Sequence, residues 1–220
     1  MQKKISIDIV SDVSCPWCII GYRGLSAALD ELQAHDNVTI EWLPYELNPT
    51  MPAEGQNRNE YIRNKYGLTP EQGKENRDNL ITRGAELGYA FNFPDDGRVY
   101  NTFNAHRLIH WAKEEGLQTP LKLALFDLFF QQQGNPSDKY DLLKCVELVG
   151  LDVAKAEAIL DSGDYVDEVR NALSFARNHN IRSVPAFIFN KKHLVSGGQP
   201  KEFFVSVLEQ FLNSYENSRL

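Results

Sequence analysis

The chain is 220 residues long, and its hydrophobic content of 42% and charged content of 24% are ordinary for a folded globular protein. Its formal net charge of −7 argues against nucleic acid or an anionic membrane as a partner, because both require clustered positive charge. The length allows one domain with a large core, or a small domain that carries an insertion.

The N-terminal segment does not have the pattern of a signal peptide. Lys3 and Lys4 precede a short apolar run, but Asp8 interrupts that run and no small-residue cleavage site follows. No stretch approaches the length of a membrane span. We therefore expect a cytoplasmic protein, in which its three cysteines would not form a stable structural disulfide.

The first predicted elements are a strand and a helix that meet at a pair of cysteines. Residues 5–10 alternate between β-branched apolar and polar positions, which is typical of a strand. Residues 16–34 predict a helix, because Pro16 suits the first helical position and apolar residues then recur on one face. Cys15 therefore stands at a helix N-terminus, and Cys18 lies one turn further in.

The spacing of Cys15 and Cys18 predicts a redox-active dithiol. Free backbone N–H groups and the helix dipole favour a thiolate at the N-terminus, so we expect a lowered pKa for Cys15. Cys18 is expected to be more buried and less ionised, as suits a resolving thiol. A metal half-site or a structural disulfide is the alternative. A metal site would need a second ligand pair, and only Cys145 and five scattered histidines remain, so we expect no metal.

The second strand is predicted over residues 37–43, parallel to the first in a β-α-β unit. Pro44 ends it, and the composition of residues 45–57 predicts a loop that leaves the sheet. We place a domain boundary there. The predicted domains are a discontinuous one formed by residues 1–57 and 164–220, and an insertion formed by residues 58–163.

The insertion shows successive helical patterns and no convincing strand. A glycine follows each expected helix, at or soon after its last residue. The expected helices cover residues 60–66, 69–87, 101–115, 120–133, 138–149 and 152–160. The fourth of these is apolar nearly all round, so we expect it to be the buried centre of the insertion.

The last part of the chain returns to the sheet. It predicts a helix over residues 164–179, short strands over 185–190 and 193–196 in hairpin spacing, and a final helix that begins near residue 200. The complete order is that of an α/β thioredoxin fold, with a central mixed four-stranded sheet and a large all-helical insertion domain.

Five short segments carry a resemblance to a known family. They are residues 12–18 (DVSCPWC), 46–49 (ELNP), 101–108 (NTFNAHRL), 183–185 (SVP) and 195–200 (VSGGQP). With these segments the chain resembles the FrnE-type branch of the DsbA-like thioredoxin-fold oxidoreductases over nearly its whole length. The resemblance implies a thioredoxin fold split by a helical insertion, and dithiol–disulfide oxidoreductase or isomerase activity on a substrate that it does not specify.

The resemblance also implies residues that bind the substrate. It implies a cis bond between Val184 and Pro185, in a loop beside the dithiol that would pair with an extended substrate segment. Asn48 is expected to line the cleft between insertion and sheet, or else simply to form an Asn-Pro turn. His106 and Arg107 are expected to face the same cleft and to meet the substrate.

Three residues close to the cysteines are expected to tune them. Pro16 begins the helix, and Trp17 stands where a strong oxidant would have a polar or positive residue, which predicts a more reducing couple than in periplasmic DsbA. Asp12 either caps the turn or relays protons to Cys18, and capping is the commoner role for Asp before a helix. Cys145 lies on an apolar helix face and is predicted to be core.

Three functions are compatible with these features. The first is a thiol–disulfide oxidoreductase or isomerase that acts on protein or peptide thiols without a bound cofactor, through a mixed disulfide on Cys15 that Cys18 resolves. The alternative is a glutathione-dependent isomerase or transferase similar to the kappa-class transferases and the hydroxychromene carboxylate isomerases, which lack the dithiol; glutathione is also a candidate co-substrate of the first function. The third is a non-catalytic peptide-binding or chaperone module. The oligomeric state stays open.

Overall fold

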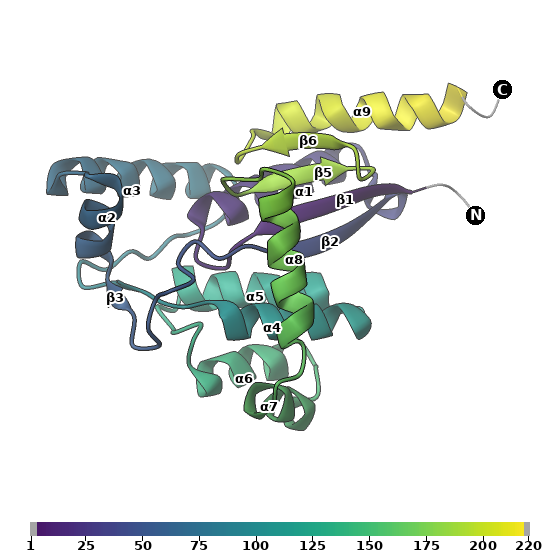
Figure 1. Cartoon of the computed structure of the whole chain (residues 1–220). Helices are drawn as coiled ribbons and strands as arrows, with labels where there is room; N and C mark the ends of the chain where they lie inside the picture. The colour runs from purple at the N-terminus through teal and green to yellow at the C-terminus, as the bar shows by residue number, and fades with distance from the viewer. Residues whose placement is uncertain (1–3, 218–220) are drawn as a thin grey trace.

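A mixed sheet of four strands organises the computed structural model, which describes residues 4–217. The strand order is β2 (Val38–Pro44), β1 (Ile5–Ser11), β5 (Ala186–Phe189) and β6 (His193–Ser196). β1 runs parallel to β2 and antiparallel to β5, and β5 pairs antiparallel with β6 (Figure 1). The expected thioredoxin-like sheet is therefore confirmed.

Helices cover both faces of this sheet and extend from one edge of it. They are α1 (Pro16–Glu31), α2 (Arg58–Tyr66), α3 (Pro70–Glu86), α4 (Phe103–Glu114), α5 (Gln118–Phe130), α6 (Lys139–Leu148), α7 (Val153–Asp161), α8 (Val166–Asn178) and α9 (Lys201–Asn217). In Figure 1, α9 lies along the β5–β6 side, while α4 to α7 lie beyond β2. None of the helices in the described part of the chain is long and apolar enough to cross a membrane.

Burial explains the layers. Ile7 and Ile9 of β1 are fully buried in the large core that α1 and α9 share, whereas Val10 packs into a smaller cluster with Ala176 of α8. β1 is thus covered on both faces, so that its polar residues Asp8 and Ser11 are buried as well.

The insertion and the sheet share one hydrophobic core. Leu108 of α4 and Phe126 of α5 belong to the same buried cluster as Ile7 of the sheet and Phe204 of α9. The boundaries at 57/58 and 163/164 stay a prediction. The two parts that they define do not have independent hydrophobic cores. The expected burial of α5 is also found, since Leu121, Leu125 and Phe126 among others are fully buried.

One element of the insertion was predicted wrongly. Residues 58–163 contain a short strand, β4 (Arg98–Val99), which pairs antiparallel with β3 (Gln56–Asn57). A pair of two-residue strands is too short for a period-two pattern to reveal it. The insertion is therefore helical apart from this ribbon.

The first helix ends three residues earlier than expected, at Glu31. Gln33 has a φ of 50°, and the Ala34 N–H donates to the Leu29 carbonyl at 2.9 Å. A left-handed residue with such a bond closes a helix C-terminus. Glycine usually holds this position, and its absence here hid the end of the helix.

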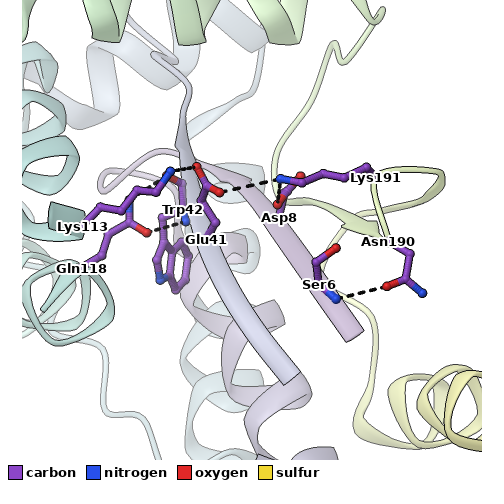
Figure 2. A network of polar contacts seen from close by, with 8 residues as sticks. All are labelled: Ser6, Asp8, Glu41, Trp42, Lys113, Gln118, Asn190 and Lys191. Atoms are coloured by element: carbon purple, nitrogen blue, oxygen red, sulfur yellow. Dashed lines mark hydrogen bonds and ion pairs between the residues drawn. The ribbon is translucent and has the colours of Figure 1, made fainter. Parts of the chain in front are cut away.

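Gln118 ties the start of α5 to the outer edge of the sheet (Figure 2). Its side-chain oxygen accepts from the Trp42 N–H at 2.9 Å, and its side-chain nitrogen donates to the Trp42 carbonyl at 3.1 Å. The side chain thus satisfies both backbone groups that β2 would otherwise offer to another strand. The register of α5 on the sheet follows from this contact.

Ion pairs continue the same connection across the sheet (Figure 2). Glu41 of β2 accepts from Lys113 of α4 at 2.5 Å and lies 3.7 Å from Lys191 of the β5–β6 turn. Lys191 also pairs at 2.6 Å with Asp8, whose side chain is 4% exposed. A buried carboxylate requires such a partner, so this turn is fixed to β1.

Candidate active site

The two cysteines lie where β1 feeds into α1. Cys15 is the residue before the first helical turn, Pro16 begins the turn, and the Cys18 N–H donates to the Cys15 carbonyl at 3.0 Å. Cys15 is 4% exposed and Cys18 is fully buried. A reactant arriving from outside therefore meets the sulfur of Cys15 first.

A second segment lies against Cys15. The Cys15 thiol donates to the Val184 carbonyl at 3.6 Å, and the bond between Val184 and Pro185 is cis. A methyl group on Gly21 of α1 would lie 3.1 Å from Gly198 Cα and 3.2 Å from Pro185 Cγ. Glycine at this position lets the dithiol helix pack closely against both segments.

Cys15 borders a cavity of about 1060 Å³. Trp17, Tyr45, Asn48 and Val184 line it near the cysteine, and α2, α3 and residues 92–100 supply most of the remaining wall. Trp17 is 39% exposed there. Cys18 and Pro185 do not line the cavity.

Asn48 is held in the cavity wall by the insertion. Its side-chain oxygen accepts from the Lys65 ammonium at 3.0 Å and from the Tyr61 hydroxyl. Lys65 also donates to the Leu47 carbonyl at 2.7 Å. The expected position of Asn48 beside the cleft is found, although its oxygen is already bonded within the protein.

Asp12 caps the turn that carries the cysteines. It is fully buried, and its carboxylate accepts from the Ser14 N–H at 3.2 Å and from the Leu47 N–H at 2.7 Å. Burial disfavours the charged form, but the hydrogen bond and charge of His106, together with the Leu47 N–H, outweigh burial and lower the pKa of Asp12. Asp12 is therefore a buried anion beneath the dithiol.

His106 reaches Asp12 from α4. It is 2% exposed, its Nε2 lies 3.7 Å from the Asp12 carboxylate, and the same nitrogen is 3.0 Å from the Tyr45 carbonyl. A carbonyl only accepts, so Nε2 carries a proton. Burial lowers the pKa of His106 despite the neighbouring carboxylate. The side chain lies under the site and not in the cavity, which corrects the expectation that it meets the substrate.

The expected position of Arg107 in the cleft is also wrong. It is 4% exposed, and its guanidinium donates to the carbonyls of Ile159, Ser162 and Asp164. These bonds hold α4 to the segment between α7 and α8. Arg107 does not line the cavity, and we no longer consider it a substrate-binding residue.

Lys122 is a site residue that the sequence prediction missed. This α5 side chain is 1% exposed, with its ammonium 3.4 Å from the Ser11 carbonyl and 5.0 Å from the Phe126 ring centre. Among the side chains of residues 4–214, no carboxylate lies within 4.0 Å of its nitrogen. Burial lowers the pKa of Lys122 to about 8, against the charges of Cys18, Asp12 and Cys15. The sequence signal that could have identified Lys122 is a single lysine in a helix that is otherwise apolar nearly all round.

The two thiols have pKa values that move in opposite directions. The hydrogen bond to Cys18, burial and the negative charge of Cys18 raise the pKa of Cys15. Burial opposes ionisation of Cys18, but the Cys15 thiol, the Ser11 hydroxyl and the charge of Lys122 outweigh it and lower the pKa of Cys18. The expected lowering at Cys15 is therefore wrong. Within the pair, these groups favour a thiolate on Cys18.

The remaining cysteine is remote from this chemistry. Cys145 is 4% exposed, its thiol donates to the Ala124 carbonyl at 3.7 Å, and burial raises its pKa to about 12. It is core, as predicted. The described residues contain no group of three or more His, Cys, Asp or Glu side chains that could hold a metal ion.

Comparison with known proteins extends these observations. The model of the DSBA-like thioredoxin domain matches residues 6–209. The chain is 29% identical to the uncharacterized protein YwbO of Bacillus subtilis (strain 168) over 201 residues, which is 91% of this chain and 94% of that protein. It is 32% identical to a probable DsbA oxidoreductase from Streptomyces coelicolor, whose crystal structure superposes with a TM-score of 0.88 and covers 94% of this chain and 89% of the other.

More distant structures share the fold. The cytosolic disulfide reductase DsbM from Pseudomonas aeruginosa, in a structure with GSH, has a TM-score of 0.66 and 14% identity over 94% of this chain and 99% of its own. A 2-hydroxychromene-2-carboxylate isomerase has a TM-score of 0.70 and 14% identity over 96% of this chain and 98% of its own. At identities this low, the comparison shows a common fold only. The chemistry of this chain has to be inferred from its own site.

Proposed function

The chain belongs to the DsbA-like thioredoxin family, and we propose that it is a thiol–disulfide oxidoreductase in which Cys15 attacks and Cys18 resolves. The observation that carries this assignment is the placement of the two sulfurs. Cys15 borders the cavity, while Cys18 lies fully buried one turn behind it, within the field of Lys122. The greater accessibility of Cys15 supports its attacking role, although its pKa is raised.

The first step is attack of the Cys15 sulfur on a substrate disulfide. The Cys15 proton passes to the neighbouring Cys18 thiolate, and the new Cys15 thiolate forms a bond to one substrate sulfur. The bond between the two substrate sulfurs breaks, and the other sulfur leaves as a thiolate. Charge is conserved, since one thiolate enters the step and one leaves it.

The second step closes the protein disulfide. Cys18 gives its proton to the departed thiolate and attacks the Cys15 sulfur, so the mixed disulfide breaks and the second substrate thiolate is released. Two electrons have then passed from the dithiol to the substrate. Lys122 stabilises the anionic form of Cys18 on which this attack depends.

Substrate recognition is proposed to involve Val184 and Asn48. The Val184 carbonyl is already within reach of the Cys15 thiol, so an extended substrate segment could pair with this backbone while its disulfide meets Cys15. Pro185 shapes the loop without reaching the cavity. Asp12 and Pro16 fix the turn that carries the cysteines, and Trp17 lines the cavity beside Cys15.

Isomerase activity and glutathione as a co-substrate are finer parts of the proposal. A shared fold with a protein determined with GSH supports a tripeptide thiol as one reactant. The intact dithiol argues against the alternative glutathione-dependent isomerase or transferase. The cytoplasmic location and the lack of a bound cofactor stay predictions.

Trapping tests the proposed roles. Cys18→Ser should accumulate a mixed disulfide on Cys15 when mixed with oxidised glutathione or a cystine-bridged peptide, because attack proceeds while resolution is lost. Cys15→Ser should trap nothing, and Cys145→Ser should behave as the unchanged protein. Mass spectrometry of digested protein locates the adduct.

Two outcomes would contradict the proposal. An adduct on Cys18 or Cys145 would reverse the roles. Peptide binding of equal strength after loss of both Cys15 and Cys18, without any exchange activity in the unchanged protein, would favour the non-catalytic binding module.

A further inference from the structure

The cavity wall is positively charged although the chain is acidic. Five basic side chains and one acidic side chain line it, in a protein whose net charge is −7. The basic residues are Arg58, Lys65, Arg77, Arg98 and Arg182, and the acidic residue is Asp96. A concave surface that gathers one sign of charge raises the local concentration of ligands of the other sign.

Two of these basic groups are already bonded within the protein. Lys65 donates to the Leu47 carbonyl and to Asn48. Arg98 donates to the carbonyls of Glu54 and Gly55 at 3.0 and 2.9 Å. Their hydrogen-bond donors are largely occupied within the protein, so we assign Lys65 and Arg98 a structural role in the wall and not a role in ligand binding.

Arg58, at the start of α2, is different. Its guanidinium lies 5.0 Å from the Phe93 ring centre, and its Nη2 donates to the Pro94 carbonyl at 3.3 Å. Its Nη1 is buried and has no hydrogen-bond partner, and no carboxylate oxygen in the described part of the chain lies within 4.0 Å of the group. A buried charged donor without a partner is costly, because no protein group replaces the water that it has lost.

Gly97, the residue before β4, leaves room for this side chain. A methyl group on Gly97 would lie 1.3 Å from Arg58 Nη2. The Arg58 N–H also donates to the Gly97 carbonyl at 2.8 Å. Gly97 therefore forms a cradle in which the guanidinium rests against the cavity.

Arg77 of α3 brings a second positive charge to the same wall. Its Nη1 donates to Asn59 at 2.7 Å, and its nearest carboxylate, that of Asp95, is 3.9 Å away and fully exposed. Burial and the charge of Arg77 together lower the pKa of Arg58 to about 10. Asp96, the acidic residue of the wall, opposes this lowering without forming an ion pair with Arg58. The two guanidinium groups therefore repel each other in a partly dehydrated wall, where the one carboxylate near Arg77 is distant and fully exposed.

We propose that Arg58 and Arg77 form a carboxylate-binding subsite, and that the substrate of the dithiol is a disulfide carrying a carboxylate a few residues from its reacting sulfur. The inference rests on the proposed function, because it names the substrate class of that same site. Planar guanidinium groups bind carboxylates through paired hydrogen bonds, and an incoming carboxylate would supply the partner that Nη1 lacks. Cys15 borders the same cavity, so one ligand can engage both groups.

The test uses matched disulfides that differ in one charge. The probes are symmetric disulfides of an acetylated cysteine followed by one, two or three glycines, each ending in either a carboxylate or an amide. Each added residue extends the reach by roughly 3.5 Å. We measure the rate at which each probe oxidises the reduced protein. The quantity compared is the rate with the carboxylate probe divided by the rate with the amide probe of the same length.

The unchanged protein should prefer the carboxylate by about tenfold at one chain length, and the preference should fall as salt is added. Arg58→Gln and Arg77→Gln should each reduce the ratio severalfold. Gly97→Ala should do the same by displacing the Arg58 side chain, and Arg58→Lys should give an intermediate ratio because it keeps charge without the planar fork. Arg63→Gln is the control, since Arg63 is an exposed arginine on the same helix outside the cavity.

The outcomes separate this inference from the proposed function. If neither type of probe oxidises the dithiol, the proposed function fails. If both react at equal rates at every length, or if the ratio is unchanged in Arg58→Gln and Gly97→Ala, only the carboxylate subsite is overturned. Oxidised glutathione is tested beside the peptides. If its oxidation rate depends on Arg58 as the peptide rates do, a tripeptide thiol is the source of the carboxylate. If the rate depends on Arg58 only with the longest peptide probe, the source is a peptide chain.

Discussion

At the scale of single residues, Lys122 is a buried cation on which the charges of the dithiol act. An ammonium that is 1% exposed destabilises a fold unless anions compensate it. The charges that act on Lys122 are those of Cys18, Asp12 and Cys15. Since Cys18 is an anion only in the reduced protein, Lys122 stabilises the reduced state more than the oxidised one.

Replacing this lysine should make the couple more reducing. Lys122→Met keeps the length of the side chain but removes the charge, so the pKa of Cys18 should rise and the reduced form should lose stability. We expect the reduction potential to become more negative by about 30 mV, which corresponds to about 1.4 kcal/mol for two electrons. Equilibration with glutathione buffers measures it, with the exposed Lys144→Met as control. A potential that is unchanged or more positive would contradict this role of Lys122.

The sequence predicted the reactive pair but not its electrostatics. Cys15 and Cys18 are recognisable from spacing alone, because a strand, two cysteines and a helix-starting proline are adjacent in the chain. The pKa expectation for Cys15 considered only the helix field. It failed because the contact with Cys18 and burial raise the pKa of Cys15, and neither can be read from the local pattern. Lys122, which lowers the pKa of Cys18, is more than a hundred residues away in sequence. Arg58 is also distant from Cys15 in sequence and carries no local motif.

At the scale of secondary-structure elements, the contact between α5 and β2 positions Lys122. Gln118 precedes it by one turn and bonds both backbone groups of Trp42 (Figure 2). Gln118→Ala should therefore lower the free energy of unfolding by about 1–3 kcal/mol, because it leaves a buried N–H and a carbonyl without partners. Urea unfolding measures the loss. Gln132→Ala, at an exposed position just beyond α5, is the matched control.

The same variant should alter the dithiol. If the Gln118 contact sets the register of α5, Gln118→Ala should shift the reduction potential in the same direction as Lys122→Met but by less. A large loss of stability with an unchanged potential would show that the contact supports the fold without positioning the charge. Apolar periodicity predicted α5 and β2 as elements, but a side chain that pairs with a strand edge leaves no periodic signal.

At the scale of the whole molecule, the sheet supplies the sulfurs and the Asp12 carboxylate, and the insertion supplies the basic side chains. Cys15 and Cys18 come from the sheet domain, whereas His106, Lys122 and Arg58 come from helices of the insertion. The order of elements predicted the thioredoxin fold because each strand and helix has its own pattern. The shared core and the charges under the dithiol depend on contacts between the two parts, which no local pattern reports.

Stability should depend on pH in a way that isolates Lys122. Its pKa is about 8 in the folded protein, against about 10.4 when unfolded, so the unfolded chain binds more protons between these values. The penalty of burying this ammonium is therefore fully present below pH 8 and is relieved as pH rises to about 10.4. Lys122→Met should be more stable than the unchanged protein by up to about 3 kcal/mol at neutral pH, and the advantage should disappear by about pH 10.4. An advantage independent of pH would mean that packing, and not charge, explains it.

The stability and the potential of this variant are linked by one thermodynamic cycle. The difference in unfolding free energy between the reduced and oxidised forms equals the difference in reduction free energy between folded and unfolded protein. Lys122→Met removes the burial penalty from both forms, but it removes a compensating thiolate interaction from the reduced form alone. The oxidised form should therefore gain more stability than the reduced form, by the same amount as the negative shift in potential, at about 1.4 kcal/mol for each 30 mV. Urea unfolding of both redox forms at neutral pH, beside the glutathione titration, measures the two sides independently. Equal gains in both forms together with a shifted potential would mean that the substitution changes the potential of the unfolded chain equally, and would place the effect of Lys122 outside the folded dithiol.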